Sequence, residues 1–272
     1  NITGCPVTIT EPGTYRVANS ITTTGTCITV NADNVTIDGQ GYNIGGLDAS
    51  GSYGVTATGR LNTTVKNVNF TFFKIGVNFD GTNSSLILNN SFYASTDVQP
   101  SAFYLSNTQD NQVINNTAWY AGTISLPRSG TYIFQGFNNT VRGNTFTDIE
   151  TDGFGIYLDT TQNNTIIDNN LLGNYYGMYL SSSRGNTVSG GWINASDYYA
   201  IYVDGTSNNG NDNNFTNINI NGTAATAGSG YDFYYAVAGI NGTWLIDMPH
   251  IGNYSFPGLG QKVNFKNSTH GT

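Results

Sequence analysis

A five-residue pattern recurs along the chain: a small residue, an apolar residue, a variable residue, a second apolar residue and a polar residue. Clear copies are Gly155-Ile-Tyr-Leu-Asp159, Gly177-Met-Tyr-Leu-Ser181 and Ala200-Ile-Tyr-Val-Asp204. Side chains of a β-strand alternate between its two faces, so the second and fourth positions share one face. The pattern therefore predicts a strand that buries these two apolar positions and exposes the third.

The pattern occurs eight times, at steps of 22 to 29 residues. The copies are Cys27-Ile-Thr-Val-Asn31, Gly54-Val-Thr-Ala-Thr58, Gly76-Val-Asn-Phe-Asp80, Ala102-Phe-Tyr-Leu-Ser106, Thr131-Tyr-Ile-Phe-Gln135 and the three given above. Most copies continue through a turn rich in Ser, Thr, Asn and Gly into a second short strand. Such a repeat without helical segments is typical of a parallel β-solenoid. We expect an all-β chain that forms a single parallel β-helix of about eight or nine coils of 22–29 residues.

Equivalent positions of successive coils are expected to stack at the inter-strand spacing of about 4.8 Å. The third position then predicts a surface aromatic ladder formed by Tyr104, Tyr157, Tyr179 and Tyr202. The turn after the main strand has an asparagine at the equivalent corner of four coils: Asn111, Asn139, Asn164 and Asn186. Asn tolerates left-handed backbone geometry, and its amide can hydrogen-bond along the stack. Folding therefore explains much of the Asn content.

The start of the chain resembles a known family. The segments Cys5-Pro-Val-Thr-Ile-Thr-Glu-Pro-Gly-Thr-Tyr15, Cys27-Ile28 and Asn34-Val-Thr-Ile-Asp-Gly-Gln-Gly41 look like the opening of right-handed parallel β-helix proteins with NosD-like repeats. They look most like the cell-surface proteins of this kind from methanogenic archaea. The resemblance covers about residues 1 to 220. It implies a right-handed solenoid in which the first strand and a disulfide cap one end of the core.

The repeat loosens after Asn221, where Ala-Ala-Thr-Ala-Gly-Ser-Gly reads as a loop. Solenoid ends need covering or pairing, so we expect the last segment to close the core. We divide one continuous domain into an N-terminal cap strand over 1–26, a parallel β-helix over 27–230, and a terminal coil with a C-terminal cap or arm over 231–272.

The charge balance narrows the possible partners. Charged residues make up 10% of the chain, and 9 basic against 17 acidic residues give a net charge of −8. No Lys/Arg cluster appears, so we expect no nucleic-acid partner. The apolar runs are too short for a membrane span. Because the chain begins at Asn1 and not at Met, we interpret it as a mature form whose leader was removed.

Two sequence features favour an extracellular or cell-surface location. Cys5 and Cys27 are the only cysteines, and an isolated pair suggests a disulfide, although two separate buried thiols would also fit. Candidate glycosylation sites of the form Asn-x-Ser/Thr begin at Asn1, Asn34, Asn62, Asn69, Asn83, Asn89, Asn115, Asn138, Asn163, Asn194, Asn214, Asn221, Asn241, Asn253 and Asn267. A repeating Asn-Asn-Thr turn would produce the same motif without glycans, and both interpretations stay open.

Candidate catalytic and metal-binding residues are few. Asp148, Glu150 and Asp152 would share one side of an extended segment and are candidate metal ligands, but we favour a solvated turn as their interpretation. Asp80 and Asp159 are separated by intervening coils that carry Ser106 and Gln135 at the same position. Asp159 and Asp204 are separated in the same way by Ser181, so these acids are spaced too widely for one catalytic pair. We expect no catalytic residues, no cofactor and no enzymatic activity.

The tyrosine column, together with Trp119, Trp192 and Trp244, has three interpretations: a sugar-stacking platform, packing within the sheet, or a contact surface. The main hypothesis is a non-catalytic structural subunit of an extracellular assembly (a filament, sheath or surface layer) built as a homopolymer through contacts between β-helices. The alternative is a secreted carbohydrate-active enzyme or glycan-binding β-helix module. Glycans, covalent or bound, are possible partners under both hypotheses.

Overall fold

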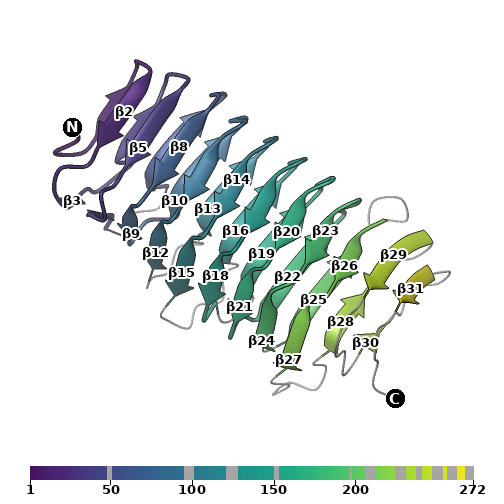
Figure 1. Ribbon diagram of the computed structural model, residues 1–272. Helices are drawn as coiled ribbons and strands as arrows, with labels where there is room; N and C mark the ends of the chain where they lie inside the picture. Colours follow the sequence, from purple (N-terminus) through teal and green to yellow (C-terminus); the bar gives the residue numbers. More distant parts are fainter. Residues whose placement is uncertain are drawn as a thin grey trace.

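The computed structural model describes residues 1–47, 51–94, 101–120, 128–149, 153–196, 198–205, 212–223, 231–236, 241–246, 254–255 and 262–266. The strands in these ranges form three parallel sheets, and each regular coil adds one strand to each sheet in turn. The coils stack along one axis, with the first strands (β1–β3) and the last described strands (β28–β31) at opposite ends (Figure 1). The described residues form strands and turns and no helix, so the predicted all-β parallel β-helix is confirmed.

The first sheet contains the main strands of the repeat. In spatial order its strands are β1 (Val7–Ile9), β4 (Ile28–Val30), β7 (Tyr53–Thr58), β10 (Ile75–Asp80), β13 (Ser101–Ser106), β16 (Ser129–Phe134), β19 (Phe154–Asp159), β22 (Tyr176–Ser181), β25 (Tyr199–Asp204), β28 (Tyr231–Tyr235) and β30 (Tyr254–Ser255). The expected count of eight or nine coils is slightly off. Strand β1 precedes the first repeat recognised in the sequence, and β28 and β30 follow the last one.

The second sheet is built from the short strands that follow the first turn. Its strands are β2 (Gly13–Arg16), β5 (Val35–Asp38), β8 (Thr63–Lys66), β11 (Leu86–Leu88), β14 (Gln112–Ile114), β17 (Thr140–Arg142), β20 (Thr165–Ile167), β23 (Thr187–Ser189), β26 (Asn214–Thr216), β29 (Asn241–Ile246) and β31 (Lys262–Lys266).

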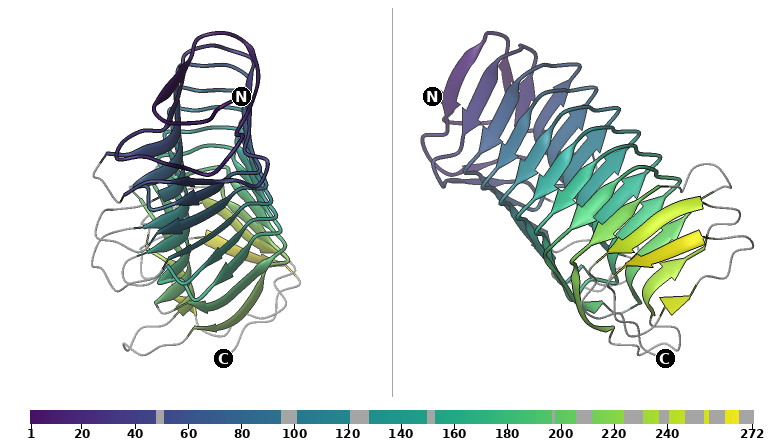
Figure 2. Two further views of the ribbon diagram at one scale, coloured as in Figure 1. Left: turned by 90° about the vertical axis from the view of Figure 1, so that its left-hand side faces the viewer. Right: turned by 45° about the vertical axis from the view of Figure 1, so that its right-hand side comes forward.

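The third sheet completes each coil. Its strands are β3 (Ile21–Thr22), β6 (Asn43–Gly45), β9 (Asn69–Thr71), β12 (Ser91–Ala94), β15 (Thr117–Tyr120), β18 (Thr145–Thr147), β21 (Asn170–Leu172), β24 (Trp192–Ser196) and β27 (Asn219–Thr223). The three sheets enclose the interior of the coil, as the two turned views show (Figure 2).

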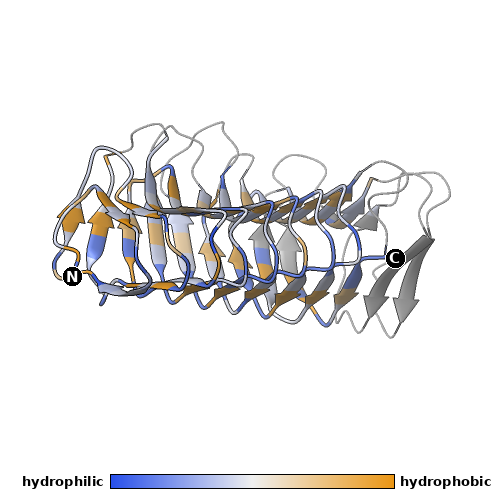
Figure 3. Ribbon diagram, turned by 90° about the horizontal axis from the view of Figure 1, so that it is seen from above, coloured by the Kyte–Doolittle hydropathy of each residue, from blue (hydrophilic) through white to orange (hydrophobic). Residues whose placement is uncertain are grey.

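The apolar interior follows from the alternation along each main strand. Ile156 and Leu158 on β19 are 0% and 1% exposed, and Met178 and Leu180 on β22 are also buried. Hydrophobic residues recur on the strands of successive coils (Figure 3). Each coil therefore buries its apolar positions against the coils before and after it, because a single coil has too little surface to form a core.

The small residue that opens the five-residue pattern, which is the second residue of strands β7 and β16, makes room there for a large side chain of the third sheet. A Cβ atom on Gly54 would collide with the ring of Phe70, and one on Gly130 would collide with the ring of Phe146. Both phenylalanines are fully buried. The small first position is therefore a packing requirement of the interior.

The predicted alignment of one repeat is wrong by one residue. Thr131 pairs with Phe103 and Tyr132 pairs with Tyr104, so the copy in β16 begins at Gly130 and not at Thr131. Phe134, and not Gln135, consequently lies in register with Ser106 and Asp159. The shift matters for the surface because it moves Tyr132 into the outward column.

The asparagine corner between the first and second sheets is confirmed. The side-chain oxygen of Asn164 accepts hydrogen bonds from the backbone N and the Nδ2 of Asn139 at 2.8 and 3.1 Å. Nδ2 of Asn164 donates to Oδ1 of Asn186 at 3.0 Å, and all three side chains are fully buried. The left-handed residues are those just before the ladder, such as Asn138 and Asn163, and not the ladder residues themselves.

A second asparagine ladder, which the sequence analysis missed, lies between the second and third sheets. It contains Asn90, Asn116, Asn144 and Asn169. Nδ2 of Asn144 donates to Oδ1 of Asn169 and to the carbonyl oxygen of Val113, both at 2.9 Å. Oδ1 of Asn144 accepts from the backbone N and Nδ2 of Asn116 at 2.8 and 3.0 Å. The ladder therefore satisfies buried polar groups of both the side chains and the backbone.

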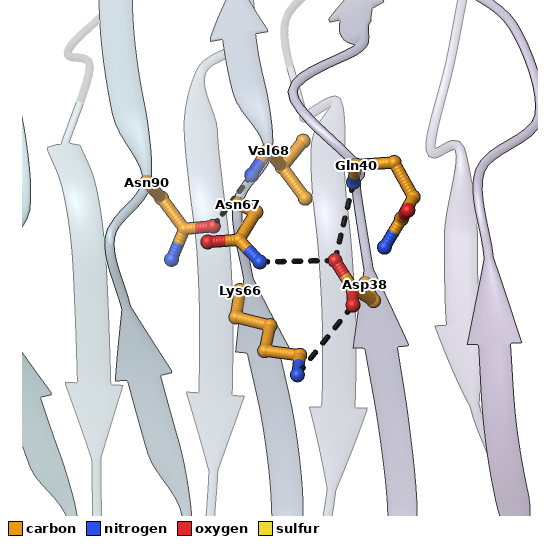
Figure 4. A network of polar contacts seen from close by, with 6 residues as sticks. All are labelled: Asp38, Gln40, Lys66, Asn67, Val68 and Asn90. Carbon is orange, nitrogen blue, oxygen red and sulfur yellow. Dashed lines mark hydrogen bonds and ion pairs between the residues drawn. The ribbon is translucent and has the colours of Figure 1, made fainter.

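Near the N-terminus, Asp38 takes part in a polar network at the corner between the second and third sheets and links two of the first coils (Figure 4). Asp38 accepts hydrogen bonds from Asn67 Nδ2 at 3.0 Å and Gln40 N at 3.2 Å, and Lys66 Nζ lies 3.5 Å away. Burial acts to raise the pKa of Asp38, but these hydrogen bonds and the Lys66 charge outweigh it, and the pKa lies below its usual value. Beside this cluster, Asn90 Oδ1 accepts from Val68 N at 3.0 Å and begins the second ladder.

The N-terminal end is tied by a disulfide between Cys5 and Cys27. Cys27 is fully buried immediately before β4, and Cys5 lies two residues before β1. Because β1 pairs with β4, the bond joins the first two rungs of the first sheet. The predicted pairing of the two cysteines is therefore present.

Loss of one ladder amide should destabilise the whole coil. Asn144→Ala removes the acceptor of Asn116, and each buried polar group left without a partner costs about 1–3 kcal/mol. We expect urea unfolding of the unglycosylated protein to show a loss of roughly 2–5 kcal/mol. The control is Asn115→Gly, which changes an exposed left-handed residue of the same corner and should stay within about 0.5 kcal/mol of the wild type. Equal losses in the two variants would contradict the role given to the ladder.

Candidate glycan-binding groove

The outward tyrosines of the first sheet form a continuous column. Ring centroids are 5.0 Å apart for Tyr104 and Tyr132, 4.5 Å for Tyr132 and Tyr157, and 4.9 Å for Tyr157 and Tyr179. The column continues through Tyr202 to Tyr234, at spacings of 5.0 and 5.1 Å. These distances follow the inter-strand spacing of about 4.8 Å, because each ring comes from the same position of the next coil.

A second column on the same outer surface comes from the first residue of each main strand. In register it consists of Tyr53, Ile75, Ser101, Ser129, Phe154, Tyr176 and Tyr199. It lies beside the tyrosine column, since the ring of Phe154 lies 4.8 Å from that of Tyr157. The two serines stand between larger residues on either side and leave the surface hollow at their positions.

A groove of about 400 Å³ occupies this hollow. Its aromatic walls are formed by Tyr53, Tyr104, Tyr132, Phe154 and Tyr157. The remaining described lining residues are Lys74, Ile75, Ser101, Arg128 and Ser129. Its volume lies in the range of small-molecule sites, and its lining combines flat rings with a few polar groups.

The polar groups of the groove are arranged along one side. Ser101 Oγ and Ser129 Oγ lie 2.8 Å apart and hydrogen-bond to each other. Lys74 directly precedes Ile75, the first residue of β10, and Arg128 directly precedes Ser129, the first residue of β16. Both cationic residues therefore line the groove from the N-terminal ends of these strands. None of Lys74, Ser101, Ser129 and Arg128 was predicted as a site residue from the sequence. A signal was present, since cations precede two of the strands that carry the repeat.

The tyrosine hydroxyls bind carboxylates farther along the strands. The hydroxyls of Tyr132 and Tyr157 donate to Oδ2 of Asp159 at 3.1 and 3.5 Å, and Tyr179 donates to Oδ2 of Asp204 at 2.6 Å. Burial, followed by the negative charge of Asp159, raises the pKa of Tyr132 and Tyr157 above the usual value. Burial and the hydrogen bond to Asp204 raise the pKa of Tyr179. These phenols therefore stay neutral hydrogen-bond donors.

The acids named from the sequence are not all brought together. Asp80, Asp159 and Asp204 lie in one register column, with two strands between Asp80 and Asp159 and one between Asp159 and Asp204. Asp148 is a left-handed corner residue after β18, while Glu150 and Asp152 lie outside the described residues. No group of three or more His, Cys, Asp or Glu side chains suited to a metal occurs among the described residues.

Several glycosylation candidates coincide with the left-handed corners. Asn89, Asn115, Asn138 and Asn163 have positive φ and are exposed, and each directly precedes a buried ladder asparagine. Folding thus accounts for the Asn-Asn-Ser/Thr motif at these positions. Glycosylation at any of the fifteen sites stays a prediction. The side chains of Asn221, Asn241, Asn253 and Asn267 lie outside the described part.

Neither Trp119 nor Trp192 is among the described residues that line the groove. Trp119 and Trp192 are 42% and 51% exposed on strands β15 and β24 of the third sheet. Trp119 lies 5.5 Å from Tyr93, ring centroid to ring centroid. The side chain of Trp244 on β29 lies outside the described part. Among the described residues, the aromatic surface that faces the groove consists of tyrosine and phenylalanine.

The raised pKa values of the column predict sensitivity to alkaline pH. Unfolded tyrosines lose their protons near pH 10, whereas the folded column holds its protons to higher pH, so the free energy of unfolding should fall as the pH rises above about 10. A spectrophotometric titration should show tyrosines that ionise only on unfolding. Asp159→Asn should lower the apparent pKa of this class, while Asp110→Asn, at an exposed corner, should not. Ionisation of every tyrosine near pH 10 in the folded protein would contradict the assignment.

Solved structures with this fold come from several carbohydrate-active proteins. A catalytic domain of a GH87 alpha-1,3-glucanase in complex with nigerose has a TM-score of 0.57 and 14% identity, and the match covers 96% of this chain and 59% of that one. The enzymatically active domain of bacteriophage CBA120 tailspike protein 2 has a TM-score of 0.58 and 14% identity, with 94% and 47% covered. An alginate lyase from Paenibacillus sp. str. FPU-7 has a TM-score of 0.59 and 11% identity, with 96% and 93% covered.

These comparisons correct the prediction that the protein is not an enzyme. The three β-helices belong to a glucanase, an enzymatically active tailspike domain and a lyase. The scarcity of recognisable catalytic motifs therefore does not exclude an enzyme with this fold. The neighbours favour the carbohydrate alternative, and neither they nor the described structure support a filament, sheath or surface-layer subunit.

In the described part of the chain, no helix is long and apolar enough to cross a membrane.

Sequence comparison gives the family. No curated protein sequence matches the chain. The NosD-like character of the repeats and an archaeal origin stay predictions. The sequence profile described as "Right handed beta helix region" matches residues 16–157 and 123–235, which together span more than half of the chain. The chain therefore belongs to the right-handed β-helix family.

Proposed function

We propose that the protein is a carbohydrate-active β-helix enzyme that binds a glycan along the tyrosine groove of the first sheet. The observation that carries this proposal is the series of flat rings that crosses successive coils at spacings of 4.5 to 5.0 Å beside a hollow lined by hydroxyls. The fold neighbours support it, since the glucanase domain was solved in complex with nigerose.

The groove has the chemistry that sugar rings need. One face of a pyranose carries C–H groups that pack against an aromatic ring, while its edges carry hydroxyls that need hydrogen-bond partners. Tyr104, Tyr132 and Tyr157 offer the rings, and Ser101 and Ser129 offer the polar groups. The groove therefore matches both surfaces of a sugar.

Asp159 is the carboxylate that we assign to the reaction. It lies on the same strand as Tyr157 and accepts hydrogen bonds from two groove tyrosines. Asp204 lies two strands away in the same column, which corresponds to about 10 Å along the stack. Glycoside hydrolysis with inversion uses two carboxyl groups about 6.5–9.5 Å apart, and this pair lies just beyond that range, so we assign Asp159 alone.

The proposed function implies action outside the cytoplasm. The Cys5–Cys27 disulfide persists in oxidising compartments. We therefore place the enzyme at the cell surface or in the surrounding medium.

The direct test is a panel of neutral and acidic polysaccharides. Incubation with the purified full chain should release reducing ends from one class of polymer, or produce the absorbance of unsaturated uronates if the chemistry is elimination. Asp159→Asn should lower the rate at least about a hundredfold while the variant remains folded by circular dichroism. Lack of binding and lack of turnover across the panel would overturn the proposal.

Affinity should depend on the groove tyrosines and not on aromatic residues in general. Tyr132→Ala removes the central ring between Tyr104 and Tyr157, and we expect the dissociation constant for a bound oligosaccharide to rise about tenfold. The matched control is Tyr93→Ala, an outward tyrosine of the third sheet, which should leave affinity unchanged. Equal effects of the two substitutions in calorimetric titrations would argue against binding in the groove.

A further inference from the structure

We propose that the outer face of the third sheet is a second carbohydrate site, which binds a neutral polysaccharide in its ordered, insoluble form. This site belongs to a different sheet from the groove and goes beyond the proposed function. It is formed by the rings of Phe72, Tyr93, Trp119 and Trp192 and by the neutral side chains between them. We call it the third-sheet platform.

The third sheet differs from the other two in charge. The nine strands that the structure assigns to it contain no Asp, Glu, Lys, Arg or His. The first sheet carries Asp80 and Asp159, and the second carries Lys66 and Arg142. A face built from charge-free strands offers no opposite charge to a polyanion or to a charged peptide, so it matches an uncharged partner.

Large rings stand on this neutral face over several coils. Tyr93 and Trp119 pair in register on β12 and β15, and their ring centroids are 5.5 Å apart. Trp119 and Trp192 are both exposed. Their strands β15 and β24 are three steps apart in the sheet, which corresponds to about 14 Å. The platform is therefore long enough to follow an extended chain.

Phe72 adds a ring to the platform at the expense of a strained backbone. It directly follows β9 and has a left-handed conformation, with φ of 57°. At the equivalent corner of two later coils stand Asp148 and Gly173, residue types that tolerate this conformation better than a bulky phenylalanine. The ring of Phe72 lies 5.4 Å from that of Tyr93. Strain that persists at such a position favours a function for the ring.

Hydroxyl and amide groups surround the rings. Thr71 and Thr147 lie in register with Tyr93 and Trp119, one at each end of the pair. The neighbouring column of the same face contains Asn69, Ser91, Thr117, Thr145 and Asn170. The platform thus combines flat rings for the C–H faces of sugars with neutral partners for their hydroxyls.

The shape of the face favours an ordered polymer over a short soluble chain. The outer side of a sheet contacts only one side of a sugar chain, whereas the groove holds its ligand between walls. A short oligosaccharide would lose much of its freedom on this face for few contacts. Chains within an insoluble particle are already fixed in place, and many contacts then act together.

The test measures retention of the purified full chain on sedimented particles of cellulose, chitin and alpha-1,3-glucan, with calcium alginate gel as the anionic comparison. We expect retention on at least one neutral particle and little on alginate. Trp119→Ala should lower the partition coefficient about tenfold, and Trp119→Tyr, which keeps a ring, should restore most of it. The matched control is Phe137→Ala, which removes a similarly exposed ring at the corner between the first and second sheets and should have no effect.

Four results would overturn the inference: no retention on any neutral particle, equal retention on alginate, unchanged retention of Trp119→Ala, or release of the protein by a soluble oligosaccharide that occupies the groove. Light scattering tests a different occupant. A dimer that Trp119→Ala converts to a monomer would show that a second copy of the chain covers this face, which would also contradict the proposal. Turnover of soluble polysaccharide is measured separately, so failure of the platform and failure of the proposed function are distinguishable.

Discussion

The structure depends on how the coil satisfies its buried backbone at the corners. A strand satisfies its N–H and C=O groups through its neighbours, but a corner turns the backbone away from the ladder. The stacked amides of Asn139, Asn164 and Asn186 at one corner, and of Asn116 and Asn144 at the other, supply the missing partners. Each amide links its own coil to the next, so the corners hold the coils in register.

Register is what makes the outer surface useful. Because the coils cannot slip, a residue type repeated at one position becomes a straight column of side chains. Tyr104, Tyr132 and Tyr157 form such a column. In the neighbouring column, formed by the first residues of the main strands, smaller residues lower the surface locally. Ser101 and Ser129 interrupt a row of larger residues there and so leave a groove. The candidate site is thus a local variation within a regular scaffold, as expected where function is carried by positions that the fold leaves free.

Much of the fold could be predicted from the sequence because it rests on short-range patterns. Alternation identified the inward Ile156 and Leu158, and the repeat placed Asn139 and Asn164 at one corner. The second ladder was missed although Asn116 ends the repeated segment Asn111-Gln-Val-Ile-Asn-Asn116. A one-residue error at Thr131 also hid Tyr132, since a strand shifted by one residue exchanges its two faces.

The groove was not predictable in the same way. It depends on side-chain volumes in five successive coils, on the burial of Arg128, and on the approach of Lys74 to the same hollow. None of these follows from spacing within one repeat. The carboxylates show the same limit: a column containing Asp159 and Asp204 was foreseen, but the hydrogen bonds from the tyrosine hydroxyls emerge only from the stacked rings.

The most direct test of this account is an NMR titration of the full chain, with labelled tyrosine, using an oligosaccharide of the class that the polysaccharide panel identifies. The account predicts that the signals of Tyr104, Tyr132 and Tyr157 shift together with a single dissociation constant, while that of Tyr93 on the third sheet does not move. Shifts confined to residues outside the groove, or no shifts at saturating ligand, would contradict it.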